Sequence, residues 1–168
     1  MSIILRHETP ADVSAITTLT AAAFLHAEHS SHTEQFIVNA LRAAGALTLS
    51  LIAEQHGTPI GHASLSPVVL SNGAADWYGL APVSVLPAYQ GQGIGSRLIR
   101  QLLAELQAER AAGCVVLGDP NYYGRFGFQA QAALTLPGVP QEYFRAVAFQ
   151  GGLPRAEVAF HAAFNAEA

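Results

Sequence analysis

Three glycines, Gly91, Gly93 and Gly95, stand on alternate positions between an apolar run and a segment with the pattern of a long helix. Glycine weakens a helix by up to about 1 kcal/mol per residue relative to alanine, so its density at a helix entrance requires a reason. A helix start leaves several backbone N–H groups unpaired, and its dipole favours negative charge. Glycines let a phosphate approach those groups closely. The stretch therefore predicts a loop that holds a phosphorylated ligand, although a tight strand-to-helix connection alone would also use glycines.

Two common phosphate-binding loops do not match this spacing. No lysine follows the last glycine, so the stretch is not the P-loop of a nucleoside-triphosphate enzyme. The dinucleotide fingerprint needs Gly-x-Gly-x-x-Gly, whereas this chain has Gly91-x-Gly93-x-Gly95 and no acidic residue at the end of the next strand. A nucleotide-dependent oxidoreductase of the Rossmann type is therefore a weak alternative.

Apolar periodicity predicts helices and strands along the whole chain. Before the glycines we expect a strand at 3–6, helices at 9–25 and 32–44, and an antiparallel meander with strands at 47–55, 60–70 and 77–85. After them we expect an amphipathic helix that stops near Gly113, a strand at 114–117 parallel to the strand before that helix, a short helix at 121–126, and strands at 143–149 and 157–161. One mixed α/β, or α+β, domain over residues 1–168 accounts for this order.

Composition narrows the class of protein. Apolar residues make up 51% of the chain and charged residues 12%, which is typical of a globular protein and not of a disordered one. No apolar run reaches the roughly 18 residues of a membrane span, and the N-terminus lacks a secretory pattern. A net charge of −4 gives no basic footprint for nucleic acid. Cys114 is the only cysteine, so we expect no intramolecular disulfide and a cytoplasmic location.

Two motifs together resemble the GNAT superfamily of acyl-CoA-dependent N-acetyltransferases. Gln90-x-x-Gly93-x-Gly95 is similar to the family signature Arg/Gln-x-x-Gly-x-Gly/Ala, and residues 122–128 are similar to its Tyr-x-x-x-Gly-Phe segment. A helix and a strand separate the two motifs, as in the family, and the order of elements matches along roughly the whole chain. Residues 118–128 resemble a bacterial branch whose acceptors are largely undefined.

The resemblance implies a fold and a reaction. The fold would be a mixed, mostly antiparallel central sheet, splayed between its fourth and fifth strands and flanked by helices. The reaction would transfer an acetyl group from acetyl-CoA to a small-molecule or peptide amine by direct attack in a ternary complex. The alternative is a non-catalytic domain that binds or senses acyl-CoA. Homodimers occur in the family, and the acceptor stays open.

The resemblance also implies roles for particular residues. Main-chain amides of the loop would hold the diphosphate of coenzyme A, and the pantetheine arm would lie along the preceding strand like an added strand. A main-chain N–H near Val85 would stabilise the oxyanion of the tetrahedral intermediate. The implied cofactor-binding residues are Val83, Ser84, Val85, Gln90, Gly91, Gln92, Gly93, Ile94, Gly95 and Ser96. Gln90 replaces the commoner arginine, and Arg97 and Arg125 are candidates for the 3′-phosphate or are simply solvated.

Tyr123 lies four residues before Gly127, the family position of the general acid that protonates the leaving thiolate. Ordinary pKa values of about 10 for a phenol and about 8.5 for a thiol suit such a transfer. Packing in the core is the other explanation for Tyr123. We expect Tyr122 to be a packing residue, and Cys114 in its apolar strand to be a poor nucleophile for a covalent intermediate.

The base that accepts the amine proton does not follow from a motif. Glu54, His62 and Asp76 lie on or next to central strands and are candidates, although a polar residue on the solvent face of a strand is the common case.

Histidines gather between the first two predicted helices. His26, His29 and His32 are spaced three residues apart with Glu28 among them, and histidine is a common metal ligand. Because the segment links two helices, we expect a solvated or acceptor-lining loop and no metal.

Overall fold

The computed structural model describes residues 2–28 and 30–168. The strands are β1 (Ile3–His7), β2 (Leu49–Gln55), β3 (Thr58–Leu70), β4 (Trp77–Val85), β5 (Gly113–Leu117), β6 (Gln129–Ala130), β7 (Leu134–Thr135), β8 (Phe144–Ala148) and β9 (Ala156–Phe160). The helices are α1 (Val13–Phe24), α2 (Glu34–Ala43), α3 (Ile94–Ala108) and α4 (Pro120–Tyr123), with 3₁₀ turns that include η3 (Gly124–Phe126), η4 (Gln141–Tyr143) and η5 (Ala162–Asn165). The two-residue strands β6 and β7 and the turns η4 and η5 were not expected from the sequence. No helix in the described ranges is long and apolar enough to cross a membrane.

The strands form one open sheet in the order β1-β2-β3-β4-β5-β8-β6. Neighbours along this path pair antiparallel except β4 and β5, which are parallel. The long strand β3 pairs with β2 and β4 along its first part, and its last three residues pair with β9. This arrangement confirms the mixed, mostly antiparallel sheet and the parallel pair around α3.

Strands β4 and β5 separate after a short contact. Only residues 77–79 of β4 pair with β5, at 113–115, so the rest of β4 has a partner on the β3 side alone. The register between β3 and β4 shifts where Ala81 and Pro82 stand opposite Ser64, and the Ala81–Pro82 peptide is cis. A bulge of this kind bends the strand that carries it. The splay expected between the fourth and fifth strands is therefore confirmed, and it leaves an open edge of β4 up to Val85.

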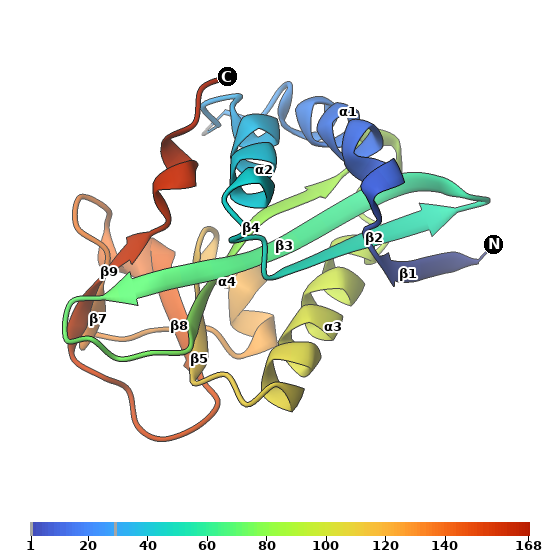
Figure 1. The fold of residues 1–168 in the computed structure, drawn as a ribbon. Helices are drawn as coiled ribbons and strands as arrows, with labels where there is room; N and C mark the ends of the chain where they lie inside the picture. Colours follow the sequence, from blue (N-terminus) through green and yellow to red (C-terminus); the bar gives the residue numbers. More distant parts are fainter. Residues whose placement is uncertain (1, 29) are drawn as a thin grey trace.

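Helices cover both faces of the sheet (Figure 1). Helix α3 lies against one face and buries an apolar stripe at helical spacing: Ile94, Leu98, Ile99, Leu102, Leu103 and Leu106. Helices α1 and α2 lie on the other face, where Ile16 and Val38 pack on Ile52. Burying an aliphatic side chain completely stabilises the folded protein by about 1.5–3 kcal/mol, so these stripes hold both helical layers against the sheet. As a result, the start of α3 is held beside the open edge of β4.

Candidate active site

A cleft of about 410 Å³ opens between the free edge of β4, the start of α3 and the segment of α4 and η3. Nine of the eleven predicted site residues line it: Val83, Val85, Gln90, Gly91, Gly93, Ile94, Gly95, Ser96 and Tyr123. Ser84 does not, because its side chain is buried on the opposite face of β4 beside α1. Gln92 does not either, because it lies exposed outside the cleft. Tyr89, Tyr122 and Arg125 complete the lining.

Unpaired main-chain donors gather at one end of this cleft. Gly91 and Gly93 have φ values of +78° and +81°, a region that glycine adopts without strain. Within the described chain, the N–H groups of residues 91–93 donate to no other group of the protein. The N–H groups of residues 94–96 form the first turn of α3 and have no acceptor inside the helix. This donor array, at the positive end of the helix dipole, suits an anionic group such as a diphosphate.

Three polar side chains near the loop make different contacts. The Gln90 amide donates from Nε2 to the carbonyl oxygen of Val85 over 2.9 Å and so ties the loop to the end of β4. Arg125 lines the cleft with its guanidinium carbon 4.9 Å from the ring centroid of Tyr122. Arg97 lies outside the cleft and donates to the carbonyl oxygen of Ile3. Of the two arginines considered from the sequence, only Arg125 is placed to meet a phosphate in the cleft.

The open edge of β4 presents main-chain groups to the cleft. The N–H of Leu86 donates to the carbonyl oxygen of Ile60 over 2.9 Å, so Leu86 faces β3. Main-chain groups alternate in direction along a strand, which turns those of Val83 and Val85 away from β3 and toward the gap. Because the carbonyl of Val85 already accepts from Gln90, its N–H and both polar groups of Val83 are the ones available.

Tyr123 is held firmly at the inner end of the cleft. Asp119 caps α4 by accepting from the N–H of Asn121 over 2.9 Å, and a Cβ at Gly118 would come within 2.5 Å of the Tyr123 ring. The ring packs edge-on against Tyr122, with centroids 5.0 Å apart. Burial, with smaller contributions from Tyr122 and Asp119, raises the pKa of Tyr123 to about 12. Tyr123 is therefore protonated at neutral pH, as a proton donor must be.

Tyr122 does more than was expected of it. It packs against Phe126, with ring centroids 5.4 Å apart, as a packing residue would. It also lines the cleft, and its hydroxyl lies 2.9 Å from where a Cβ on Gly95 would stand. A side chain at position 95 would therefore crowd the Tyr122 hydroxyl, whereas Gly91 and Gly93 are favoured by their backbone conformation.

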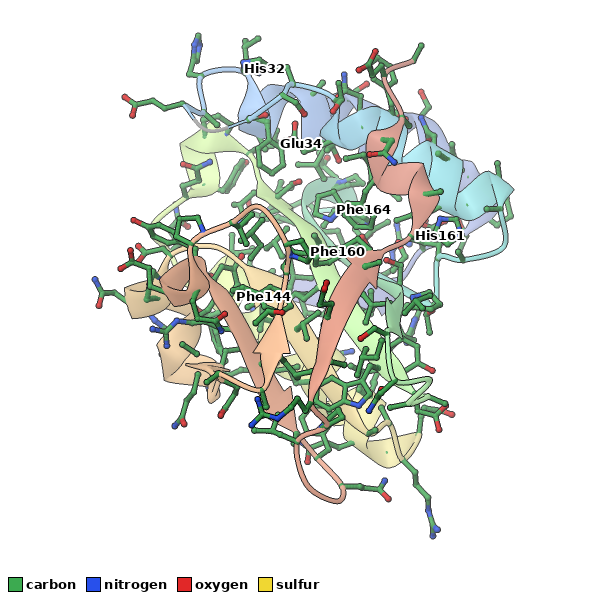
Figure 2. The ribbon with its side chains drawn as sticks, turned by 90° about the vertical axis from the view of Figure 1, so that its left-hand side faces the viewer. His32, Glu34, Phe144, Phe160, His161 and Phe164 are labelled. Atoms are coloured by element: carbon green, nitrogen blue, oxygen red, sulfur yellow. The ribbon has the colours of Figure 1, made fainter. Side chains whose placement is uncertain are left out.

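A second cavity of about 340 Å³ lies on the other side of Tyr123 and shares Val83 and Tyr123 with the first. Its remaining walls come from α1, α2, the bulge of β4, β5, β9 and η5: Phe24, Glu34, Ile37, Leu80, Ala81, Pro82, Leu117, Phe160 and Phe164. Figure 2 labels three of these lining residues, Glu34, Phe160 and Phe164. Sequence patterns could not indicate Glu34, Phe160 or Phe164, because residues from elements so far apart in the chain share no motif.

The three candidate bases lie outside both cavities. Glu54 accepts from Arg6 over 2.8 Å at the pairing of β1 and β2. Asp76 precedes β4 at the end of that strand away from Val85. His62 is fully buried, its Nε2 2.7 Å from Ser50 Oγ, and burial lowers its pKa to about 4. The structure thus places none of the three where the amine would react.

Two of the three clustered histidines, His26 and His32, lie in the described part of the chain. His26 lies after α1 and lines a cavity of about 360 Å³ that also touches residues 83–85 of β4. His32 is exposed with a φ of +62°, and His29 lies outside the described residues. Over residues 2–28 and 30–168, no three His, Cys, Asp or Glu side chains are grouped to hold a metal ion. Cys114 is fully buried in β5, and burial raises its thiol pKa far above the usual value.

Comparison with known proteins connects this geometry to a family. The model of the acetyltransferase (GNAT) family matches residues 13–128. The uncharacterized N-acetyltransferase YhbS of Escherichia coli K12 is 37% identical over 131 residues, which are 77% of this chain and 75% of YhbS. A GNAT family acetyltransferase from Brucella melitensis, crystallised with acetyl-CoA, superposes with a TM-score of 0.87 at 48% identity over 97% of this chain and 98% of its own. Crystalline E. coli YhbS in complex with CoA gives a TM-score of 0.85 at 32% identity over 97% of this chain and 92% of its own. The chain belongs to the GNAT acetyltransferase family, as its two motifs predicted.

Proposed function

We propose that this protein transfers the acetyl group of acetyl-CoA directly to an amine in a ternary complex. One observation carries the proposal: Tyr123 stands between two cavities, and an array of free main-chain N–H donors lies at the far end of the first. The diphosphate of the co-substrate fits the donors of residues 91–96, with Arg125 near enough to add positive charge. The pantetheine arm fits along Val83 and Val85, which brings the thioester to Tyr123.

The chain's own groups then act on the reacting atoms. The amine nitrogen attacks the thioester carbon, and the oxyanion that forms meets a main-chain N–H of β4. As the carbon–sulfur bond breaks, the phenol of Tyr123 gives its proton to the departing sulfur. The positively charged nitrogen of the intermediate is a much stronger acid than this phenol, so it returns a proton to Tyr123 as it becomes an amide. One proton has then moved from nitrogen to sulfur. Cys114 is too deeply buried to form an acyl intermediate.

The experiment is an acetyl-CoA thiol-release assay over a panel of amines, with products identified by mass. Tyr123→Phe should lower turnover by about 10²- to 10⁴-fold, because it removes the proton donor. Affinity for coenzyme A, measured by calorimetry, should stay nearly unchanged, because the diphosphate contacts remain. The matched control is Tyr143→Phe, since Tyr143 is exposed and lines neither cavity.

Two results would contradict the proposal. Equal turnover by wild type and Tyr123→Phe would remove Tyr123 from the reaction. Tight binding of coenzyme A without thiol release from any amine would identify a binding or sensing domain instead of an enzyme.

A further inference from the structure

The second cavity, which we call the acceptor cavity, has an unusual lining for a site that would bind a polar amine. Its walls are mainly apolar and aromatic: Phe24, Ile37, Leu80, Leu117, Phe160 and Phe164. Phe160 and Phe164 pack with ring centroids 5.1 Å apart and form one wall. At about 340 Å³, the cavity is at the small end of the range for ligand sites, roughly 300–1,000 Å³. Its volume and its apolar lining therefore suit a compact apolar group better than a long polar chain.

One charged side chain, Glu34, lines this cavity. Its two carboxylate oxygens accept from Ser30 Oγ over 2.7 and 2.8 Å, which fixes the direction of the carboxylate. In the part of the chain that the structure describes, no Lys, Arg or His side chain pairs with Glu34. Glu34 is half-buried, so its carboxylate offers a negative charge beside apolar walls, and a ligand ammonium can pair with that charge.

We infer that the acceptor is a primary amine on a compact apolar group, aromatic or branched aliphatic, without a carboxylate of its own. This inference rests on the proposed function. The apolar group fills the space between Phe160, Phe164 and Leu117, and Glu34 holds the ammonium of the incoming amine. This ammonium releases one proton to solvent before its nitrogen attacks the thioester carbon. Because Val83 and Tyr123 belong to both cavities, a small acceptor that shifts inward from Glu34 meets the thioester. An acidic acceptor is disfavoured, because its carboxylate would be placed near Glu34.

The first test compares matched acceptors at saturating acetyl-CoA. 2-Phenylethylamine and 3-methylbutylamine should give the highest kcat/KM. Phenylalanine adds a carboxylate to the same ring and amine, and it should be at least about tenfold poorer because that carboxylate would lie near Glu34. Ethanolamine should be poorer by a similar factor because it lacks the apolar group. Saturation-transfer NMR with coenzyme A present should show 2-phenylethylamine bound and phenylalanine unbound.

The second test changes the carboxylate. Glu34→Gln should raise KM for 2-phenylethylamine roughly ten- to a hundredfold, since a charge-assisted contact is lost. Its coenzyme A affinity should stay unchanged, because Glu34 lies outside the cofactor cleft. Glu34→Asp, which keeps the charge, should have a KM between those of wild type and Glu34→Gln. The matched control is Glu28→Gln, which removes the same charge from an exposed position between α1 and α2 that lines neither cavity.

The possible outcomes separate the inference from the function on which it rests. Faster acetylation of hydrophilic or acidic amines, with dependence on Tyr123 kept, overturns the inference and leaves the acetyltransferase. An unchanged KM in Glu34→Gln removes Glu34 from acceptor recognition and also overturns it. Thiol release from no amine, with coenzyme A still bound, overturns both.

Discussion

Gly95 gives the most specific prediction about the cofactor cleft. The family signature accepts glycine or alanine here, so Gly95→Ala is the mildest change available. In this chain, however, the new Cβ would stand 2.9 Å from the hydroxyl oxygen of Tyr122, where ordinary contacts begin at 3.4 Å. The oxygen must therefore move by about 0.5 Å to remove the overlap.

A movement of Tyr122 should lower activity, because neighbouring groups of the cleft must move with it. Its ring is packed against Tyr123 and Phe126, with Arg125 above it, so it does not move alone. We expect Gly95→Ala to lower kcat/KM for acetyl-CoA about three- to tenfold, with a coupling to Tyr122 of about 1 kcal/mol. The protein itself should not lose stability, because alanine favours a helix by up to about 1 kcal/mol over glycine.

A double-mutant cycle checks this reasoning. Gly95→Ala, Tyr122→Phe and the double variant are compared with wild type by thiol release and by calorimetric binding of coenzyme A. Since Tyr122→Phe removes the overlapping oxygen, Gly95→Ala should leave kcat/KM and coenzyme A affinity almost unchanged in that background. Gly124→Ala is the control, because a Cβ there meets nothing within 4 Å. If Gly95→Ala lowers kcat/KM as much in the Tyr122→Phe background as in wild type, the contact with the Tyr122 hydroxyl is not the cause of the loss.

Two further predictions concern stability. Gly93 has a φ of +81°, so Gly93→Ala should lower the free energy of unfolding by about 1–2 kcal/mol in urea, whereas an equal effect of Gly124→Ala, at a φ of −58°, would contradict the backbone argument. Because burial lowers the pKa of His62 from 6.5 to about 4, the unfolded chain binds a proton between these pH values that the folded protein does not. The contribution of His62 to the free energy of unfolding is therefore complete above about pH 6.5 and decreases toward pH 4. About 2 kcal/mol of it is lost at pH 5. Urea midpoints at pH 7.5 and 5 should show this loss for wild type and less of it for His62→Gln, and equal losses would exclude His62 as its source.

Features carried by neighbouring residues could be predicted from the sequence. The glycine loop, the helix after it and the parallel strand follow from short patterns, and the structure contains all three. Tyr123 was chosen because its position four residues before Gly127 matches the family motif, and the structure brings it to the same cleft as Gly93. Ser84 was included because it lies between Val83 and Val85 on the strand before the loop, and Gln92 because it lies within the glycine motif. The side chains of both lie outside the cleft.

The acceptor side of the site could not be predicted in this way. Glu34 comes from α2 and Phe164 from η5, and they meet only because α2 packs beside the C-terminal segment. The base candidates were chosen by their positions on central strands, but strand position does not say which end of a strand approaches Tyr123. Asp76 and Val85 belong to the same part of the chain and lie at opposite ends of β4.

The sequence by itself therefore determined the order of the elements and the phosphate-type loop, and its resemblance to the family marked Tyr123 as the candidate proton donor. These depend on backbone conformation and on residues within about one turn or one strand of each other. Only the tertiary structure decided how far β4 and β5 separate, which of Arg97 and Arg125 reaches the cleft, and that Glu34 enters an apolar cavity beside Tyr123. These features are set by packing between elements distant in the chain, where burial and register, and not local pattern, select the neighbours.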